Sequence, residues 1–192
     1  VTDNMYALAE SGYWLGGECP TGYKNKRVFY TDSSGKQKSY SVLEPISKEV
    51  KLVKLIFEKY LFFGSLSKLE KYMLSNNIKT KRNKDFSKTS LSSILRNPAY
   101  VRADKNVFKY FKSLKINTFG NPDDLHGVLI YKKHKGKKGK THDISEWIYS
   151  ISSHEGIIAA EDWLNVQKML DSNKSRAPAL GCSNTALLSG LV

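Results

Sequence analysis

The chain has 192 residues, with 31 Lys and Arg against 18 Asp and Glu, so its formal net charge is +13. This length allows one large or two small domains, and a hydrophobic content of 40% is enough for a buried core. The charge favours a polyanionic partner, most often nucleic acid, although a basic protein without such a partner is the alternative. No apolar run is long enough to cross a membrane, so we expect no membrane partner.

The cysteines, histidines and first residues exclude several classes of protein. The chain begins with Val1 rather than Met and has no signal peptide, so we expect a fragment of a longer protein. Cys19 and Cys182 are far apart, which favours reduced thiols in the cytoplasm over a disulfide framework. No spacing indicates a nucleotide-binding glycine loop or a catalytic triad, so we expect no enzyme activity. We expect no metal site or cofactor, because no cysteine or i, i+4 partner supports the histidines: His126, His134, His142 and His154.

The first 45 residues predict a helix end, an arm and a hairpin. Residues 1–11 have the pattern of the end of a helix, and the segment 12–22 is rich in Gly and Pro, typical of a linker or extended arm. Two β-type runs, Val28–Thr31 and Lys38–Val42, flank a turn at Asp32–Gly35. This arrangement predicts a β-hairpin.

Three helices are expected next. The first begins near Ser47 and ends at Gly64. The second is capped by Ser65 or by Ser67, and the spacing of Ser67 to Glu70 matches a capping box. The third follows a basic loop, is capped by Ser87 and ends before Pro98. Three helices of this size resemble a helix-turn-helix unit, although a three-helix core without any DNA role has the same periodicity.

The helix that follows Ser87 is the most informative stretch. Leu91, Ile94 and Leu95 share one face, which we expect to pack inward. The opposite face is polar and basic and has no carboxylate, which suits a helix in the major groove of DNA; a surface helix with solvated charges would look the same. The candidate base-reading residues are Lys88, Thr89, Ser90, Ser92, Ser93 and Arg96, of which Arg96 also suits a phosphate contact or a helix cap. The candidate phosphate anchors in the preceding loop are Lys79, Lys81, Arg82 and Lys84.

The second half of the chain has a different character. The aromatic residues Phe108, Tyr110 and Phe111 favour a core, and the run Lys132–Lys140, with six lysines, predicts a cationic loop that is either solvated or in contact with phosphates. Further elements are expected as strands at Gly127–Tyr131, Trp147–Ser152 and Leu187–Val192 and as a helix at Glu161–Ser172. Together the patterns predict an α+β fold with a helical, helix-turn-helix-like DNA-binding domain and a hairpin over residues 1–112. A smaller α/β domain is expected over residues 113–192.

Several ordered motifs resemble the recombinase domain of the large serine recombinases. Gly12–Tyr23 is similar to the family's opening pattern G-x-W-x-G-G-x-x-P-x-G-Y, and Ile94–Tyr100 resembles its most specific signature. The family usually has glycine where this chain has Asn77 and Arg102. Less specific similarities lie at Ile56-Phe57, Tyr60, Gly64-Ser65, Asn77–Thr80 and Phe86-Ser87. The start of the family's zinc-ribbon domain is similar to Trp147, His154–Ile158, Glu161, Val166-Gln167 and Leu187–Leu191.

The resemblance implies the function that we expect. Such recombinases integrate or excise phage and transposon DNA, and their catalytic serine lies in a separate N-terminal domain that this sequence does not contain. We therefore expect a fragment that binds duplex DNA at an attachment-site or transposon-end half-site without cutting it. Residues 113–192 would begin a zinc ribbon that is truncated before its cysteines, so zinc is expected only in the full-length, self-associating protein. The segment Gly12–Tyr23 would follow the DNA backbone or minor groove, which makes Trp14 and Tyr23 candidate contacts.

Two other classes fit the composition. A helix-turn-helix transcriptional regulator with a second, ligand-sensing domain would bind a palindromic site as a dimer. A basic structural or RNA-binding protein would prefer single-stranded RNA to duplex DNA.

Overall fold

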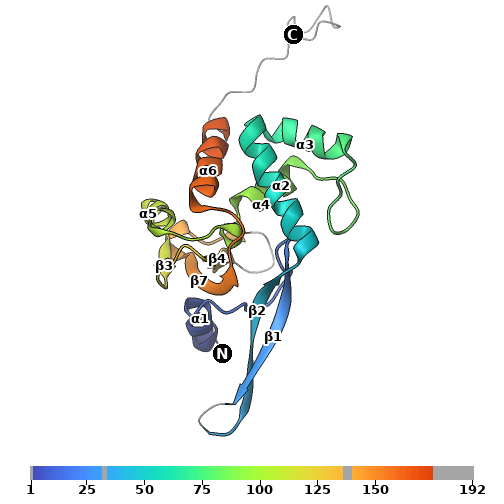
Figure 1. The fold of residues 1–192 in the computed structure, drawn as a ribbon. Coiled ribbons are helices and arrows are strands. Elements are labelled where there is room, and N and C mark those ends of the chain that lie inside the picture. The colour runs from blue at the N-terminus through green and yellow to red at the C-terminus, as the bar shows by residue number, and fades with distance from the viewer. Residues whose placement is uncertain (1, 32–33, 136–139, 175–192) are drawn as a thin grey trace, which may run out of the picture.

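The structure, a computed structural model, describes residues 2–31, 34–135 and 140–174. The chain begins with helix α1 (Thr2–Glu10), and an arm without regular structure leads into the strands β1 (Tyr23–Thr31) and β2 (Gln37–Pro45). The two strands pair antiparallel along all nine of their residues and project from the molecule as a ribbon (Figure 1). The predicted hairpin is confirmed. The arm runs beside it, because the backbone N–H of Trp14 donates to the Ser41 carbonyl at 2.9 Å.

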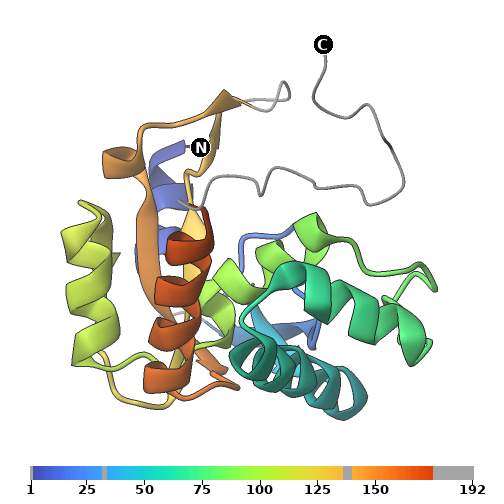
Figure 2. The same cartoon turned by 90° about the horizontal axis from the view of Figure 1, so that it is seen from above.

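Three helices follow the hairpin and form one side of the molecule: α2 (Ser47–Phe63), α3 (Leu66–Ser75) and α4 (Lys88–Arg96) (Figures 1 and 2). Helix α2 ends, as predicted, at Gly64, whose φ of 62° lies in the left-handed region that glycine adopts without strain. The predicted capping box of Ser67 and Glu70 is wrong, because Ser65 is the N-cap of α3 and Ser67 lies within the helix. Glu70 instead accepts the backbone N–H of Lys88 at 3.1 Å and so joins α3 to α4.

Helix α4 has the amphipathic structure that its sequence predicts. The Ser87 hydroxyl accepts the Ser90 backbone N–H at 3.2 Å, and the Ser90 hydroxyl accepts the Ser87 N–H at 2.9 Å, so the two residues cap the helix reciprocally. Leu91 and Leu95 are completely buried, while Ile94 is half-buried. The inward-facing side of the helix is therefore confirmed.

The rest of the described chain forms a small mixed sheet with two helices. Strand β7 (Ile148–Glu155) is central, with β3 (Asn117–Phe119) parallel to it on one side and β4 (His126–Tyr131) antiparallel on the other. Helix α5 (Lys105–Ser113) packs on β3, and helix α6 (Ala160–Lys174) packs on α5, α2 and α4. Phe111 of α5 joins the sheet to α6, because its ring lies 4.7 Å from that of Tyr149 and 5.8 Å from that of Trp163.

The remaining described elements are two-residue strands and single helical turns: β5 (His134–Lys135), β6 (Lys140–Thr141), η1 (Pro98–Tyr100) and η2 (Ile144–Glu146). The predicted strand at Leu187–Val192, residue Cys182 and the centre of the lysine run lie outside the described residues.

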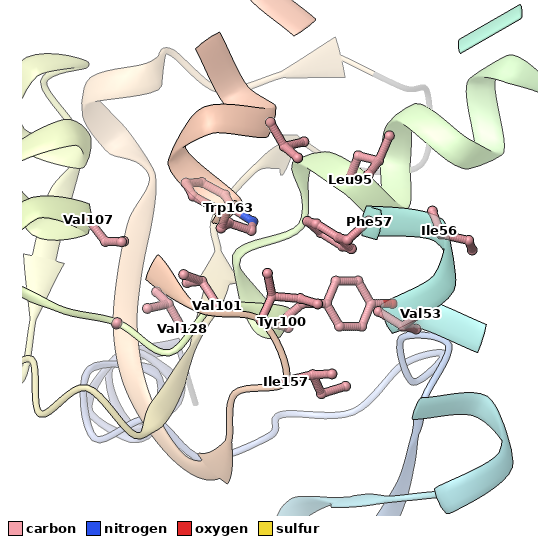
Figure 3. Packing of buried hydrophobic residues seen from close by; sticks show 14 of the residues in the cluster. Val53, Ile56, Phe57, Leu95, Tyr100, Val101, Val107, Val128, Ile157 and Trp163 are labelled. Atoms are coloured by element: carbon pink, nitrogen blue, oxygen red, sulfur yellow. The ribbon is translucent and has the colours of Figure 1, made fainter. Parts of the chain in front are cut away.

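The turn that contains η1 joins the three helices to the sheet. The Tyr100 carbonyl accepts the backbone N–H groups of Ile157 and Ile158 at 2.7 and 2.8 Å, and the Tyr100 hydroxyl donates to the Thr21 carbonyl of the arm at 2.8 Å. Its ring lies among the core side chains that Figure 3 labels, between Val53 of α2 and Ile157. The signature that ends at Tyr100 is therefore a structural junction.

The two positions where the family usually has glycine differ in their backbone. Asn77 has a φ of 52°, a left-handed conformation that asparagine tolerates better than most residues, so its place in the fold is one that suits glycine. Arg102 has no positive φ, and its N–H donates to the Ile158 carbonyl at 2.8 Å. An L residue is therefore unstrained at position 102.

One hydrophobic cluster extends across the predicted boundary between residues 112 and 113. It includes Phe57 of α2, Leu95 of α4 and Phe111 of α5, together with Val128 of β4 and Trp163 of α6. The aromatic residues Phe108 and Phe111 are buried in it, as predicted. A division of the chain into two domains at this boundary stays a prediction.

A buried histidine makes the fold sensitive to acid. His154 is 2% exposed, its Nε2 donates to the Ala99 carbonyl at 2.8 Å, and its Nδ1 has no partner. Burial lowers the pKa of His154 to about 4. As the pH falls, the unfolded chain protonates His154 at a higher pH than the folded chain does. The stability that neutral His154 contributes is therefore fully present above its unfolded-state pKa and is lost as the pH falls toward its folded-state pKa.

We therefore expect the free energy of unfolding to fall by about 2 kcal/mol between about pH 7 and about pH 5 because of His154 alone. Urea denaturation at the two pH values measures this. The variant His154→Gln keeps a donor for Ala99 but cannot titrate, so it should lack this part of the loss. Equal losses in the variant and the wild type would show that His154 is not the group responsible.

Candidate nucleic-acid interface

The outer face of α4 is accessible over most of its length. Lys88, Thr89 and Ser93 are exposed, and Ser92 is half-buried. Ser90 is also half-buried, and its hydroxyl is already engaged in the helix cap. The side chains that are available for a new contact are therefore those of Lys88, Thr89, Ser92 and Ser93.

Both ends of this face have a carboxylate that the sequence of the helix itself lacks. At the first turn, Nζ of Lys88 lies 3.9 Å from the Glu70 carboxylate of α3. At the last turn, the Arg96 guanidinium donates to the Asp171 carboxylate of α6 at 2.6 Å. This contact joins α4 to α6. It differs from the roles predicted for Arg96, which were base reading, a phosphate contact or a helix cap. Ion pairs with partly exposed side chains such as these contribute little to stability and exchange readily for other partners.

The basic loop between α3 and α4 is held against the arm. Glu18 of the arm forms ion pairs with Lys81 at 3.1 Å and with Arg82 at 2.8 Å. Lys79 pairs with Asp85 within the loop, whereas Lys84 is exposed and forms no ion pair in the described part of the chain. The hydrogen bond from Lys81, together with the charge of Arg82, lowers the pKa of Glu18. The loop therefore has one cation without a partner and three that are paired with carboxylates.

The two aromatic residues predicted in the arm have different environments. Trp14 is half-buried, and its indole Nε1 has no acceptor among the described residues. Tyr23 is only 3% exposed, and its hydroxyl donates to the carbonyls of Ala99 and Glu155 at 3.3 and 2.8 Å. The Tyr23 side chain is thus enclosed by the core, and its contact with DNA stays a prediction. Burial also raises the pKa of the Tyr23 hydroxyl, which keeps it protonated as a donor.

A hollow of about 440 Å³ lies between the arm and α4. It brings together four of the predicted site residues, which are Trp14, Ser92, Ser93 and Arg96. Lys79, Lys84 and Lys88 do not line it, whereas Lys133 of the predicted cationic loop does, as does Glu18, which was not predicted as a site residue. Glu18 lies within the family's opening pattern and Lys133 within the lysine run, but no local pattern could show that these segments meet at α4.

Buried donors of α6 hold α4 in place behind this surface. The side-chain amide of Gln167, which is 1% exposed, donates to the Leu95 carbonyl in the last turn of α4 at 2.8 Å. The indole N–H of Trp163 donates at 3.3 Å to the carbonyl of Asn97, which follows α4 and also accepts the backbone N–H of Tyr100. Carbonyls at a helix C-terminus lack partners within the helix, so the bond from Gln167 satisfies a Leu95 carbonyl that burial would otherwise leave unpaired.

Comparison with known proteins identifies the class. A protein-family model named Recombinase matches residues 47–173, more than half of the chain, so this chain belongs to the recombinase family. No significant match is found among curated proteins. The matched region extends from α2 through α6 and includes His154–Ile158 and Gln167, so the similarity of these residues to the start of a zinc ribbon stays a prediction.

A solved structure described as a crystal structure of an LSR–DNA complex has a similar fold. The TM-score is 0.52 with 16% sequence identity, and the similarity covers 97% of this chain and 42% of that chain. This chain therefore spans less than half the length of the LSR, a large serine recombinase. At this identity the comparison concerns the fold, and it agrees with the predicted α+β class.

We expect the Gln167→Met variant to lose about 1–3 kcal/mol of unfolding free energy, because it leaves the buried Leu95 carbonyl without a donor while it fills a similar volume. Urea denaturation at neutral pH measures the loss. The adjacent exposed residue provides a control, Lys168→Met, which should change stability by less than about 0.5 kcal/mol. Equal stability of the Gln167→Met variant and the wild type would show that this bond does not support α4.

Proposed function

We propose that this chain is the site-specific DNA-binding part of a large serine recombinase that integrates or excises mobile DNA. The observation that carries the proposal is the outer face of α4. It is accessible, has no carboxylate of its own, and is fixed to a core within a chain of net charge +13. Membership of the recombinase family and the fold of the LSR in its DNA complex support the same reading.

In this proposal α4 enters the major groove of a half-site. Thr89, Ser92 and Ser93 have short side chains that allow close approach, and hydroxyl groups can bond to base edges. Lys84 and the residues Lys81 and Arg82 contact phosphates, which hold the protein in register without reading sequence. Lys88, at the first turn, reaches either a base or a phosphate.

The other expectations for the parent protein are part of the proposal. Strand cleavage would belong to a catalytic domain outside this chain, and zinc to a ribbon that follows the recombinase domain. In the described residues, no group of three His, Cys, Asp or Glu side chains could hold a metal ion. No helix within the described ranges is long and apolar enough to cross a membrane. We also propose a cytoplasmic location and self-association of the full-length protein.

Alanine substitutions in α4 test the recognition role. After the preferred duplex has been selected from random sequences, the Thr89→Ala and Ser92→Ala variants should each lose about 1–3 kcal/mol of binding energy on that duplex. On a scrambled duplex they should bind as the wild type does. The Lys84→Ala variant should weaken binding to both duplexes equally and make the slope of log K against log salt shallower by about 0.9. Fluorescence anisotropy over a salt series measures all three.

If the α4 variants lose equal binding energy on the selected and the scrambled duplex, the recognition role of this helix is overturned. Preference of the wild-type chain for single-stranded RNA would favour an RNA-binding protein instead. Binding of a palindromic duplex by a dimer of this chain would favour a transcriptional regulator.

Glu18 competes with DNA for the basic loop if Lys81 and Arg82 are phosphate contacts. The Glu18→Gln variant removes the charge that pairs with both cations, so we expect tighter binding to every duplex, by about 3- to 30-fold at low salt. Replacing the exposed Glu58 of α2 by Gln changes the net charge equally and provides the control. A gain no larger than that of Glu58→Gln would show that the ion pairs of Glu18 do not oppose DNA binding.

A further inference from the structure

The β1–β2 ribbon projects away from the core without a further strand. No other strand of the described chain pairs with it, and Figure 1 shows its far end beyond the rest of the fold. Its base is anchored, because Tyr23 and Leu43 are each only 3% exposed. A two-stranded hairpin is marginally stable in water, so a ribbon of this length, whose outer half is largely exposed on both faces, provides surface for contact with a partner rather than for the core.

Strand register defines one polar face of this ribbon. Residues that are directly paired across an antiparallel ladder lie on the same face, and Arg27 pairs with Ser41, Phe29 with Ser39 and Thr31 with Gln37. We call this set, together with Asn25, the Arg27 face. Six of its members are exposed, and none is acidic: Asn25, Arg27, Phe29, Thr31, Gln37 and Ser39.

The two faces of the ribbon differ in their electrostatics. The opposite face has three lysines, of which Lys24 and Lys26 pair with the Glu44 carboxylate at 2.9 and 2.8 Å and are partly neutralised, while Lys38 lies further out beside Tyr30. Arg27 forms no ion pair with any described residue. The Arg27 face is therefore the one that offers an uncompensated guanidinium together with amide and hydroxyl groups.

The Arg27 face adjoins the surface on which α4 lies. Arg27 and Ser39 line a hollow of about 320 Å³ together with Trp14. Trp14 also lines the hollow that contains Ser92 and Ser93 of α4. The arm is thus shared by two neighbouring hollows, one at the ribbon and one at α4.

We propose that the Arg27 face is a second DNA-contacting element, which enters a groove of the same duplex that α4 reads. This inference rests on the proposed function. The major groove is wide enough for a two-stranded β-ribbon, and strands read it in other DNA-binding proteins. An arginine can bond a guanine, Asn and Gln can bond an adenine, and an exposed Phe can contact a thymine methyl group. The favourable partner is an anionic duplex rather than a protein, because this face has a cation and no carboxylate.

Two ribbon variants, Arg27→Ala and Phe29→Ala, test the inference on the selected duplex. Both side chains are exposed, so the fold should persist, and thermal melting checks it. We expect Arg27→Ala to weaken binding about 10-fold and to make the salt slope shallower by about 0.9. We expect Phe29→Ala to weaken binding about 3- to 10-fold without changing the slope. The control Lys109→Ala removes one exposed cation on α5 and should change affinity less than about 2-fold.

Hydroxyl-radical footprinting locates the contact. Each ribbon variant should lose protection over one block of nucleotides, separate from the block that the Thr89→Ala variant of α4 affects. Wild-type affinity and footprints for both ribbon variants, while α4 variants still lose specificity, would overturn this inference and leave the proposed function standing. Failure of the wild-type chain to bind duplex DNA would overturn both. An unchanged footprint with reduced self-association in sedimentation would overturn it in favour of an interface between copies.

Discussion

The turn from Asn97 to Tyr100 joins three parts of the chain that are distant in sequence. The Asn97 side chain accepts the backbone N–H of Ala99 at 3.0 Å and so closes the turn after α4. The Ala99 carbonyl then accepts His154 of β7 and the Tyr23 hydroxyl, while the Tyr100 carbonyl accepts two N–H groups that follow β7. Because buried carbonyls need partners, this turn fixes the sheet, the base of the hairpin and the end of α4 relative to one another.

The placement of α4 depends on this junction and on α6. The apolar side of the helix is held by Leu91 and Leu95, while the Leu95 carbonyl in its last turn accepts the Gln167 side chain of α6. Helix α6 also contacts the end of α2, because Asn173 donates to the Gly64 carbonyl at 2.8 Å. A helix whose two ends and inner face are fixed by separate elements can present its outer residues in one geometry, which is what selective reading of a groove requires.

Charge is distributed less simply than the net value of +13 suggests. Several candidate phosphate contacts are paired with carboxylates: Lys81 and Arg82 with Glu18, and Arg96 with Asp171. These carboxylates come from the arm and from α6, and each lies at the surface. When a polyanion binds at this surface, its phosphates would replace these carboxylates as partners of the cations. The affinity therefore depends on the free energy needed to break each ion pair.

Local sequence determined the elements themselves. The amphipathic stripe and Ser87 cap of α4, the end of α2 at Gly64 and the antiparallel pairing of the hairpin strands were all correctly predicted, because each depends on residues that are close in sequence. For the cap of α3 the sequence left Ser65 and Ser67 as alternatives, and Ser65 is the cap in the fold; only the capping box of Ser67 with Glu70 was wrong. In the fold, Glu70 bonds α4 instead.

Only the tertiary structure decided which residues meet. Tyr23 belongs to a motif whose aromatic residues were expected at DNA, yet its ring stacks on Tyr100 at 6.0 Å inside the core. The pairing of Glu18 with the basic loop and of Arg96 with Asp171 joins segments that are more than sixty residues apart. Periodicity shows which side of an element is buried but not which distant element covers it, because that choice depends on how the whole core packs. The sequence by itself therefore determined the hairpin, the helices other than α5 and the buried face of α4, and packing determined their neighbours.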